Sequence, residues 1–250
     1  IKNMEKNILK NKNCLITGAT GGLGKALSIE FAKNGCNLFL VAQNTSNLNF
    51  LKSELQKLNK HISVNTFSVD LSNLLELSDL IKKIKKMFNR IDILINCAGI
   101  LPIKLIQDST IDDFDKCFNV NIRAPIILTK EFSKEMKNQK WGRIVNIASS
   151  GAYNGQPKTI IYRASKHALL GFSKAIHKEF RNYNVRTYCI SPGPIKSGMG
   201  KKIPSLLNYD ENYQTFIDPN DIADFISNLI SYDSEMFSEE IRLGRIIGEK

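Results

Sequence analysis

Short apolar runs alternate along the chain with longer stretches in which apolar residues recur every three or four positions. The short runs are rich in Ile, Leu, Val and Phe and bounded by turn residues, which is typical of strands buried in a parallel sheet. The longer stretches are typical of helices that cover such a sheet. The expected strands lie at 14–17, 37–41, 63–68, 93–96, 143–147 and 186–190. The expected helices lie at 22–34, 46–59, 74–88, 111–138 and 161–181, with a last one from Pro219.

This alternation predicts βαβ units, and therefore an α/β fold with a Rossmann-like, doubly wound parallel sheet in three α/β/α layers. The chain has 250 residues, 42% of them hydrophobic, and shows no internal repeat or interdomain linker. We therefore expect a single domain over 1–250. The stretch 195–216 mixes glycine, proline and lysine with apolar side chains and is long for a connection in a compact domain. We expect it to be a substrate lid, with a plain surface connection as the alternative.

The chain carries 35 Lys and Arg against 24 Asp and Glu, a net charge of +11. In the segment 80–88, Ile81, Ile84 and Phe88 share one helical face, so we expect the lysines between them to cover the solvent side. No basic run is interleaved with aromatic residues, and no nucleic-acid-binding module is recognised, so we expect no nucleic-acid partner. An anionic substrate or an acidic carrier protein stays open as a reason for the charge.

The cysteines, histidines and apolar runs restrict the cellular setting. The five cysteines are odd in number and have no Cys-x-x-Cys spacing, so they are interpreted as reduced core thiols. The three histidines are scattered, and we expect no metal site. No apolar run approaches the ~18 residues of a membrane helix. The first ten residues are charged throughout, unlike a signal peptide. We expect a cytoplasmic protein without membrane contact.

A glycine-rich turn separates the first expected strand from the first expected helix. It reads Thr17-Gly18-Ala19-Thr20-Gly21-Gly22-Leu23-Gly24. Glycines at 18, 22 and 24 allow close backbone approach, and the helix that follows presents free N–H groups and its positive dipole end. This arrangement predicts a dinucleotide site, with a ligand-free turn as the alternative.

A second motif points to proton transfer. Tyr162 and Lys166 lie four residues apart, so they share a face of the expected helix. An ammonium at Lys166 would favour the ionised form of a phenol whose ordinary pKa is about 10. Ser149 stands thirteen residues upstream. The alternative is that each residue has a structural role, with Tyr162 buried and Lys166 on the surface.

Together these residues resemble the landmarks of the short-chain dehydrogenase/reductase family, and the resemblance runs from about residue 12 to about residue 226. Departures are Cys97, where asparagine is common, and Ser197, where threonine is common. The C-terminus also lacks the family's glycine pair, which puts a last strand and a tetramer contact in doubt. The landmarks occur in order as the glycine turn, Asp70, Asn96-Cys97-Ala98-Gly99, Asn121, Ser149, Tyr162, Lys166 and Pro192-Gly193.

The resemblance implies an NAD(P)H-dependent oxidoreductase that interconverts a carbonyl and a secondary alcohol by hydride transfer. Ser149 would hydrogen-bond the substrate carbonyl, and Tyr162 would deliver the proton as general acid/base. Lys166 would lower the pKa of Tyr162 and hold the nicotinamide ribose, while Asn121 would position a water. Ser150 is a neighbouring candidate, but Ser149 keeps the family spacing to Tyr162.

The resemblance also implies the cofactor contacts. Asp70 would contact the adenine, although alone it could equally cap a helix. At the end of the second strand, Gln43 leaves no carboxylate to repel a 2′-phosphate, so NADP(H) is favoured over NAD(H). Members of the family that prefer NADP(H) usually carry arginine at the position of Gln43 or a basic residue at the position of Gly21. This chain has neither. The full implied set is Gly18, Thr20, Gly22, Leu23, Gly24, Gln43, Asp70, Leu71, Asn96, Ala98, Gly99, Tyr162, Lys166, Pro192, Gly193, Ile195 and Ser197.

Partners are implied in the same way. The family suggests a homodimer or homotetramer assembled through the helices near 111–138 and 161–181. The substrate is expected to be a small carbonyl or alcohol, and one specific alternative is a 3-oxoacyl group on an acyl carrier protein. A non-catalytic, redox-sensing NAD(P)-binding module is the non-enzyme alternative. An extended sugar-nucleotide epimerase is disfavoured, because too little chain follows Pro192 to build a substrate domain.

Overall fold

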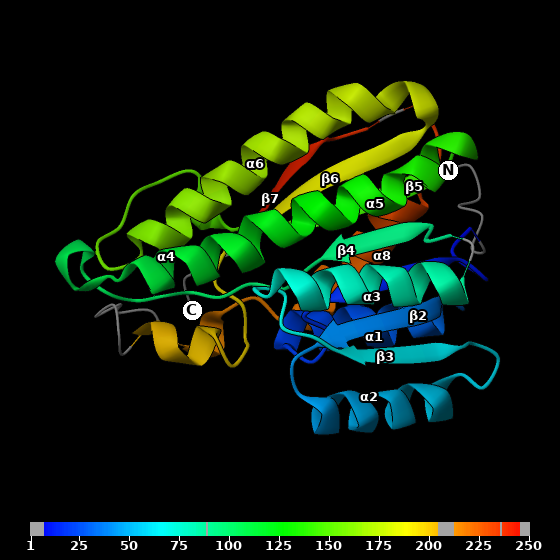
Figure 1. Cartoon of the computed structure of the whole chain (residues 1–250), viewed down its shortest axis with the longest axis horizontal. Coiled ribbons are helices and arrows are strands. Elements are labelled where there is room, and N and C mark those ends of the chain that lie inside the picture. The colour runs from blue at the N-terminus through cyan, green and yellow to red at the C-terminus, as the bar shows by residue number, and fades with distance from the viewer. Residues whose placement is uncertain (1–7, 89, 205–212, 236, 246–250) are drawn as a thin grey trace.

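In a computed structural model of the chain, which describes residues 8–88, 90–204, 213–235 and 237–245, seven parallel strands form one sheet (Figure 1). Their order across the sheet is β3-β2-β1-β4-β5-β6-β7. This is the doubly wound parallel sheet that the sequence predicts. The strands are β1 (Asn13–Thr17), β2 (Asn37–Ala42), β3 (Val64–Ser68), β4 (Ile93–Asn96), β5 (Gly142–Ile147), β6 (Val185–Pro192) and β7 (Glu240–Leu243).

Helices cover both faces of the sheet and bury a hydrophobic core on each. Helices α1, α2 and α8 pack on one face, and α3, α5 and α6 pack on the other. No helix within the described ranges is both long and apolar enough to cross a membrane. The helices are α1 (Gly22–Lys33), α2 (Thr45–Leu58), α3 (Leu74–Met87), α4 (Ile111–Phe118), α5 (Ala124–Asn138), α6 (Ile160–Phe180) and α8 (Pro219–Ser231).

Two features differ from the sequence-based expectation. The helix expected at 111–138 is divided by a π-helical turn, Asn119–Arg123, between α4 and α5. Strand β7, which the C-terminal sequence had put in doubt, is present and pairs in parallel with the end of β6. Its four residues include no fully buried side chain, so the apolar run that marks the central strands is missing there.

The strand order reverses between β1 and β4, and this reversal positions the site. Strand β1 pairs with β2 on one side and with β4 on the other. The connections after β1 and β4 therefore leave the sheet in opposite directions and open a crevice at the carboxyl ends of the strands. The glycine turn follows β1, and the segments carrying Gly99, Ser149 and Gly193 follow β4, β5 and β6. All four segments meet at this edge.

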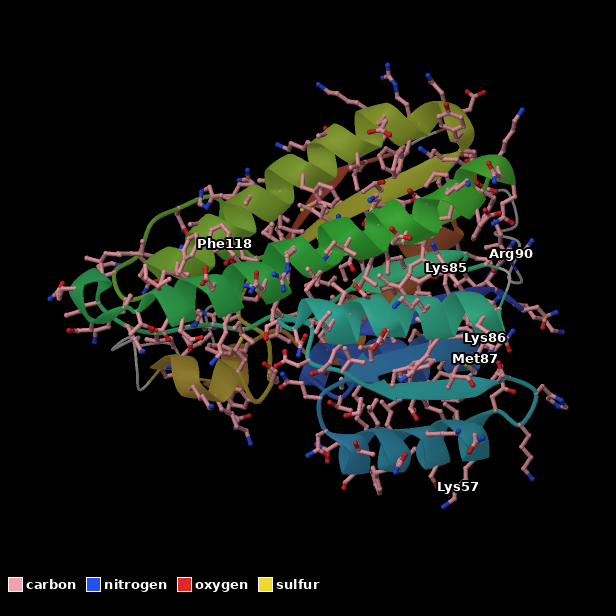
Figure 2. The ribbon with its side chains drawn as sticks, in the orientation of Figure 1. Lys57, Lys85, Lys86, Met87, Arg90 and Phe118 are labelled. Atoms are coloured by element: carbon pink, nitrogen blue, oxygen red, sulfur yellow. The ribbon has the colours of Figure 1, made fainter. Side chains whose placement is uncertain are left out.

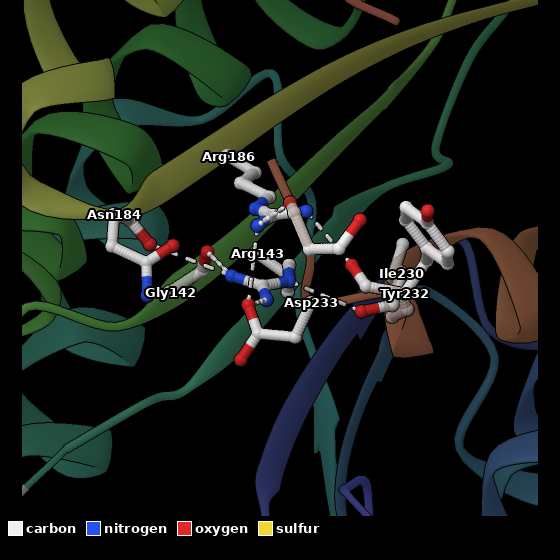
Figure 3. Close-up of polar contacts among 8 residues, drawn as sticks. Gly142, Arg143, Asn184, Arg186, Ile230, Tyr232 and Asp233 are labelled. Carbon is white, nitrogen blue, oxygen red and sulfur yellow. Dashed lines mark hydrogen bonds and ion pairs between the residues drawn. The ribbon is translucent and has the colours of Figure 1, made fainter. Parts of the chain in front are cut away.

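At the opposite, amino-terminal end of the sheet a buried arginine ties three elements together (Figure 3). Arg143 on β5 is 0% exposed. Its Nε donates to the carbonyl oxygen of Ile230 in α8 at 3.1 Å, and its Nη2 lies 2.5 Å from Asp233 Oδ1. Arg186 on β6 lies 3.3 Å from the same carboxylate oxygen. This network fixes β5, β6 and the end of α8 at the edge remote from the crevice.

The lysine-rich segment of α3 is arranged as its periodicity predicts. Ile81 and Ile84 are buried, and Phe88 packs edge-on against Phe39 with ring centroids 4.4 Å apart. Lysines on the other face of α3 are exposed. Figure 2 shows Lys57 at the end of α2 pointing away from the fold. Much of the positive charge is therefore spread over the solvent face of these helices.

Candidate active site

The turn after β1 is shaped by contacts that only glycine permits. Gly18 has φ +67°, and a Cβ there would lie 2.8 Å from Ala98 Cα. A Cβ on Gly24 would lie 2.1 Å from the Gly18 carbonyl oxygen, and one on Gly22 would lie 2.9 Å from Ser197 Cβ. Helix α1 begins at Gly22 without a side-chain cap, so its first N–H groups face outward from the turn. This is a backbone cradle of the kind that binds phosphate.

A cavity of about 670 Å³ runs along the carboxyl edge of the sheet, in front of this turn. That volume is in the range of small-molecule and cofactor sites. Most of the residues that the sequence assigns to the site line one cavity. They are Gly18, Thr20, Gly22, Leu23, Gly24, Gln43, Leu71, Ala98, Gly99, Ser149, Tyr162, Lys166, Pro192, Gly193, Ile195 and Ser197.

Asp70 and Asn96 are not among the lining residues. The Asp70 carboxylate accepts from the Ser72 backbone N–H at 2.8 Å, whereas the side-chain cap of α3 is Asn73. Asp70 therefore stabilises the turn after β3 and does not cap the helix. Asn96 is 2% exposed and donates to Asn146 Oδ1 at 2.7 Å beneath the cavity. A direct role of either side chain at the cofactor stays a prediction.

Asn121 also lies behind the cavity wall, in the π-helical turn between α4 and α5. Such turns are frequent at functional sites. Its Oδ1 accepts from the Ile100 backbone N–H at 3.0 Å. A Cβ on Gly99 would lie 3.5 Å from Asn121 Oδ1 and 3.6 Å from Lys166 Nζ. Asn121 and Lys166 therefore flank the same glycine, which places the amide near the ammonium.

Lys166 is almost completely buried, with 4% of its surface exposed. Its Nζ donates to the carbonyl oxygen of Ile147, the last residue of β5, at 2.8 Å. Burial disfavours the charged form and lowers the pKa of Lys166 to about 8. The ammonium lies 5.7 Å from the centroid of the Tyr162 ring.

The pKa of Tyr162 corrects one expectation. Burial raises it above its ordinary value, against the lowering effects of a hydrogen bond with Ser149 and of the charge on Arg163. The sequence suggested that Lys166 would lower this pKa. In the structure the Lys166 ammonium is directed to the Ile147 carbonyl instead, and desolvation has the larger effect on the phenol.

Ser149 is the serine that contacts the tyrosine. It precedes a short 3-10 turn, and its Oγ accepts from the Gly151 backbone N–H at 3.0 Å. The same hydroxyl lies beside the Tyr162 ring at Gly151, and its interaction with the phenol lowers the pKa of Tyr162. Ser150 also lines the cavity but is exposed. The geometry therefore favours Ser149 over Ser150 as the partner of Tyr162.

Part of the expected lid borders the cavity. Ile195 pairs with Ile217 in an isolated β-bridge, and Met199 and Ile203 line the cavity. Phe216 is 3% exposed, so it anchors the end of the segment. Of the apolar residues expected in this lid, Leu206, Leu207 and Tyr209 lie outside the described residues. Movement of the segment as a lid stays a prediction.

The sequence reasoning missed one polar wall of the cavity. Its residues belong to the loop between β5 and α6 and to the first turn of α6, where no recognised motif directs attention. The strongest available signal was Arg163, a long charged residue directly after Tyr162. The wall consists of Asn154, Gln156, Thr159 and Arg163.

Comparison with known proteins agrees with this geometry. Residues 12–207 match the family model for short chain dehydrogenase. The chain is 33% identical over 235 residues to a 3-oxoacyl-(acyl-carrier-protein) reductase of Rickettsia bellii, covering 90% of this chain and 92% of that protein. A reductase of the same name from Thermotoga maritima is 32% identical over 196 residues, covering 78% and 79% of the two chains. The crystal structure of levodione reductase superposes with a TM-score of 0.85 at 25% identity, over 94% of this chain and 96% of the other.

The chain belongs to the short-chain dehydrogenase family. It is an NAD(P)-dependent dehydrogenase/reductase, as the resemblance of its motifs implies.

Proposed function

We propose that this protein interconverts a carbonyl and a secondary alcohol by hydride transfer with NAD(P)H, with Tyr162 as general acid/base. The observation that carries the proposal is the position of Ser149, Tyr162 and Lys166 along one cavity, whose wall also includes the glycine cradle of the β1–α1 turn. A dinucleotide in that cradle would extend toward the tyrosine.

Each side chain suits one step of the reduction. Ser149, held by Gly151, donates a hydrogen bond to the substrate oxygen and polarises the carbonyl. The raised pKa of Tyr162 keeps its proton in place at neutral pH, so the phenol can transfer it to the substrate oxygen as the carbonyl carbon is reduced. The hydride is supplied by the cofactor when bound. Lys166, with a pKa of about 8, stays largely protonated at pH 7, and its ammonium holds the start of α6 to the end of β5 through the Ile147 carbonyl.

The residues present fit a dinucleotide. Gly18 and Gly22 leave backbone space that any Cβ would fill, and the uncapped start of α1 offers N–H groups to a pyrophosphate. Lys166 and Ser197 line the same cavity and offer polar groups along it.

We propose a preference for NADP(H) over NAD(H). The support comes from the end of β2, where Gln43 lines the cavity and no acidic residue follows directly. The next side chain, Asn44, accepts from the Asn47 backbone N–H at 2.8 Å and caps α2. A 2′-phosphate therefore meets amides at this position, whereas a carboxylate would repel it.

For the substrate we propose a 3-oxoacyl thioester, including one attached to an acidic carrier protein. Two relatives are named as reductases of this kind, and the net charge of +11 suits an acidic partner. Lys201 and Lys202 are exposed in the 3-10 turn Gly200–Lys202, which begins at the cavity-lining Gly200. We propose that such a carrier docks against these two lysines.

We further propose a homodimer or homotetramer that uses α4, α5 and α6. The support is apolar surface on these helices, since Ile111 is 77%, Phe114 43% and Ile160 46% exposed. Light scattering of the wild type and of Ile111→Lys tests this proposal, because a wild-type monomer would refute it. The cytoplasmic location stays a prediction.

The function is tested by a parallel fluorescence titration of the purified protein with NADPH and NADH. A panel of ketones and 3-oxoacyl thioesters, beginning with acetoacetyl-CoA, is then assayed with the cofactor that binds. Binding with turnover supports the proposal. Binding without turnover across the panel would favour a redox-sensing module, and failure to bind either cofactor would refute the proposed function.

A further inference from the structure

Arg163 makes an unusual set of contacts for a residue next to the proposed acid. Its Nε donates to Thr159 Oγ1 at 2.9 Å, its Nη1 to the Asn154 carbonyl oxygen at 3.0 Å, and its Nη2 to Gln156 Oε1 at 2.5 Å. A further bond joins Nη1 to the Asn154 side chain. All three partners line the cavity. A single guanidinium therefore bonds to three residues of the cavity wall that precedes the first turn of α6.

The aliphatic part of Arg163 packs at the other side of the site. A Cβ on Gly151 would lie 3.4 Å from Arg163 Cγ, 3.4 Å from Ser149 Oγ and 3.6 Å from Tyr162 Cε1. The arginine stem, the serine hydroxyl and the tyrosine ring are thus packed around one glycine. Arg163 lies next to Tyr162 on α6, and its stem packs beside Gly151 in the turn that follows Ser149.

We propose that Arg163 is a positioning residue: its guanidinium ties residues 154–159 to the start of α6 and thereby holds the Ser149 hydroxyl against that of Tyr162. The inference rests on the proposed function, because the pair that it aligns is the proposed proton-transfer pair. The planar guanidinium reaches several acceptors in fixed geometry, which the single ammonium of a lysine does not.

The electrostatics of Tyr162 agree with this role. Burial raises the pKa of the phenol, and the charge on Arg163 acts with the Ser149 hydrogen bond to lower it. Cys117 on α4 raises it, and the Lys166 ammonium lies 5.7 Å from the ring centroid. Removal of the Arg163 charge therefore raises the pKa of Tyr162, and alcohol oxidation, which needs the phenolate, would require a higher pH.

The kinetic test compares Arg163→Met and Arg163→Lys with the matched control Lys57→Met, which removes an outward-pointing cation on α2. The substrate is acetoacetyl-CoA or, if that is not turned over, the ketone with the highest turnover in the panel. We expect Arg163→Met to lower kcat by about tenfold to a hundredfold, with cofactor affinity unchanged. We expect Arg163→Lys to recover little of the loss. We also expect the pH profile of oxidation to move upward in Arg163→Met.

A double-mutant cycle separates positioning from direct action on the substrate. If Arg163 acts by aligning Ser149, then Arg163→Met has little effect on kcat in a Ser149→Ala background. An equal loss in both backgrounds would overturn the inference. So would an Arg163→Met enzyme that behaves like Lys57→Met.

A second measurement does not depend on the substrate. Backbone hydrogen exchange over residues 150–159 is expected to be faster in Arg163→Met than in the wild type and in Lys57→Met. Unchanged exchange refutes the proposed clamp, which is the attachment of residues 154–159 to the start of α6 by the Arg163 guanidinium, even if the enzyme is active. Faster exchange in a protein that neither binds NAD(P)H nor reduces any carbonyl confirms the clamp but refutes the proposed function, and with it the catalytic purpose of the clamp.

Discussion

The Nζ of Lys166 lies 2.8 Å from the carbonyl oxygen of Ile147, so a buried ammonium joins α6 to the end of β5. Ser149 lies two residues after Ile147 in the sequence, and Tyr162 lies one helical turn before Lys166. The contact therefore sets the distance between the segments that carry the serine and the tyrosine. It also places a charge where only 4% of the lysine surface meets solvent.

Burial of Lys166 predicts a pH-dependent cost in stability. Its pKa is lowered from 10.5 to about 8, so the unfolded chain binds the proton more tightly between these values. The cost is about 3 kcal/mol below pH 8 and falls as the pH rises toward 10.5. Lys166→Met removes this cost, although it leaves the Ile147 carbonyl without its donor.

Urea unfolding of wild type and Lys166→Met at pH 7 to 10 measures this effect. The difference in free energy of unfolding between variant and wild type should decrease with rising pH above about 8. Taking the difference removes the contribution of titrating groups that do not interact with Lys166, whereas Cys97, Cys117 and Cys189 are coupled to it. A difference that is constant with pH would contradict the lowered pKa.

Gly18 predicts a loss of cofactor binding on substitution. In Gly18→Ala the new Cβ meets Ala98 at 2.8 Å in a backbone region that favours glycine, so the cradle must shift. We expect affinity for NADPH to fall by at least about tenfold, because a small displacement misaligns the N–H groups. Fluorescence titration measures the affinity.

Gly171→Ala is the matched control. Gly171 lies in α6 with nothing within 4 Å of its Cβ position. Alanine there should leave cofactor affinity unchanged and stabilise the helix by about 0.5–1 kcal/mol. Equal cofactor affinity in Gly18→Ala and Gly171→Ala would contradict the assignment of the turn.

Gln43 predicts a change of cofactor preference. In Gln43→Asp a carboxylate would accept a ribose hydroxyl and repel a 2′-phosphate, so the ratio of NADPH to NADH affinity should fall by about tenfold. Gln43→Arg should raise the same ratio. The dissociation constants for NADPH and NADH, measured for each variant, give this ratio. If neither substitution moves the ratio, the ribose end of the cofactor lies elsewhere.

Local sequence rules were sufficient for much of the fold and site. The glycines of the β1–α1 turn, and Lys166 four residues after Tyr162, follow from backbone geometry that the sequence shows directly. Strand β7 could not be predicted with the same ease, because its residues are only partly buried and its pairing with β6 depends on the finished sheet.

Two further properties depend on three-dimensional packing. The raised pKa of Tyr162 results from burial, which helix spacing does not reveal, and the Lys166 ammonium is directed to a carbonyl from another element. The polar wall held by Arg163 is formed by a loop whose path no motif specifies. Helical spacing thus predicted that Tyr162 and Lys166 lie on one face. The pKa of Tyr162 and the hydrogen-bond partner of Lys166 depend on how the other elements pack around them.

The central claim is that Tyr162 is the acid in an NAD(P)H-dependent reduction, and Tyr162→Phe tests it most directly. The phenyl ring keeps the packing and removes the hydroxyl. For the best carbonyl substrate we expect kcat to fall by about 10²- to 10⁴-fold, while the dissociation constant for NADPH stays within about twofold of the wild type. Unchanged turnover by Tyr162→Phe would contradict the account.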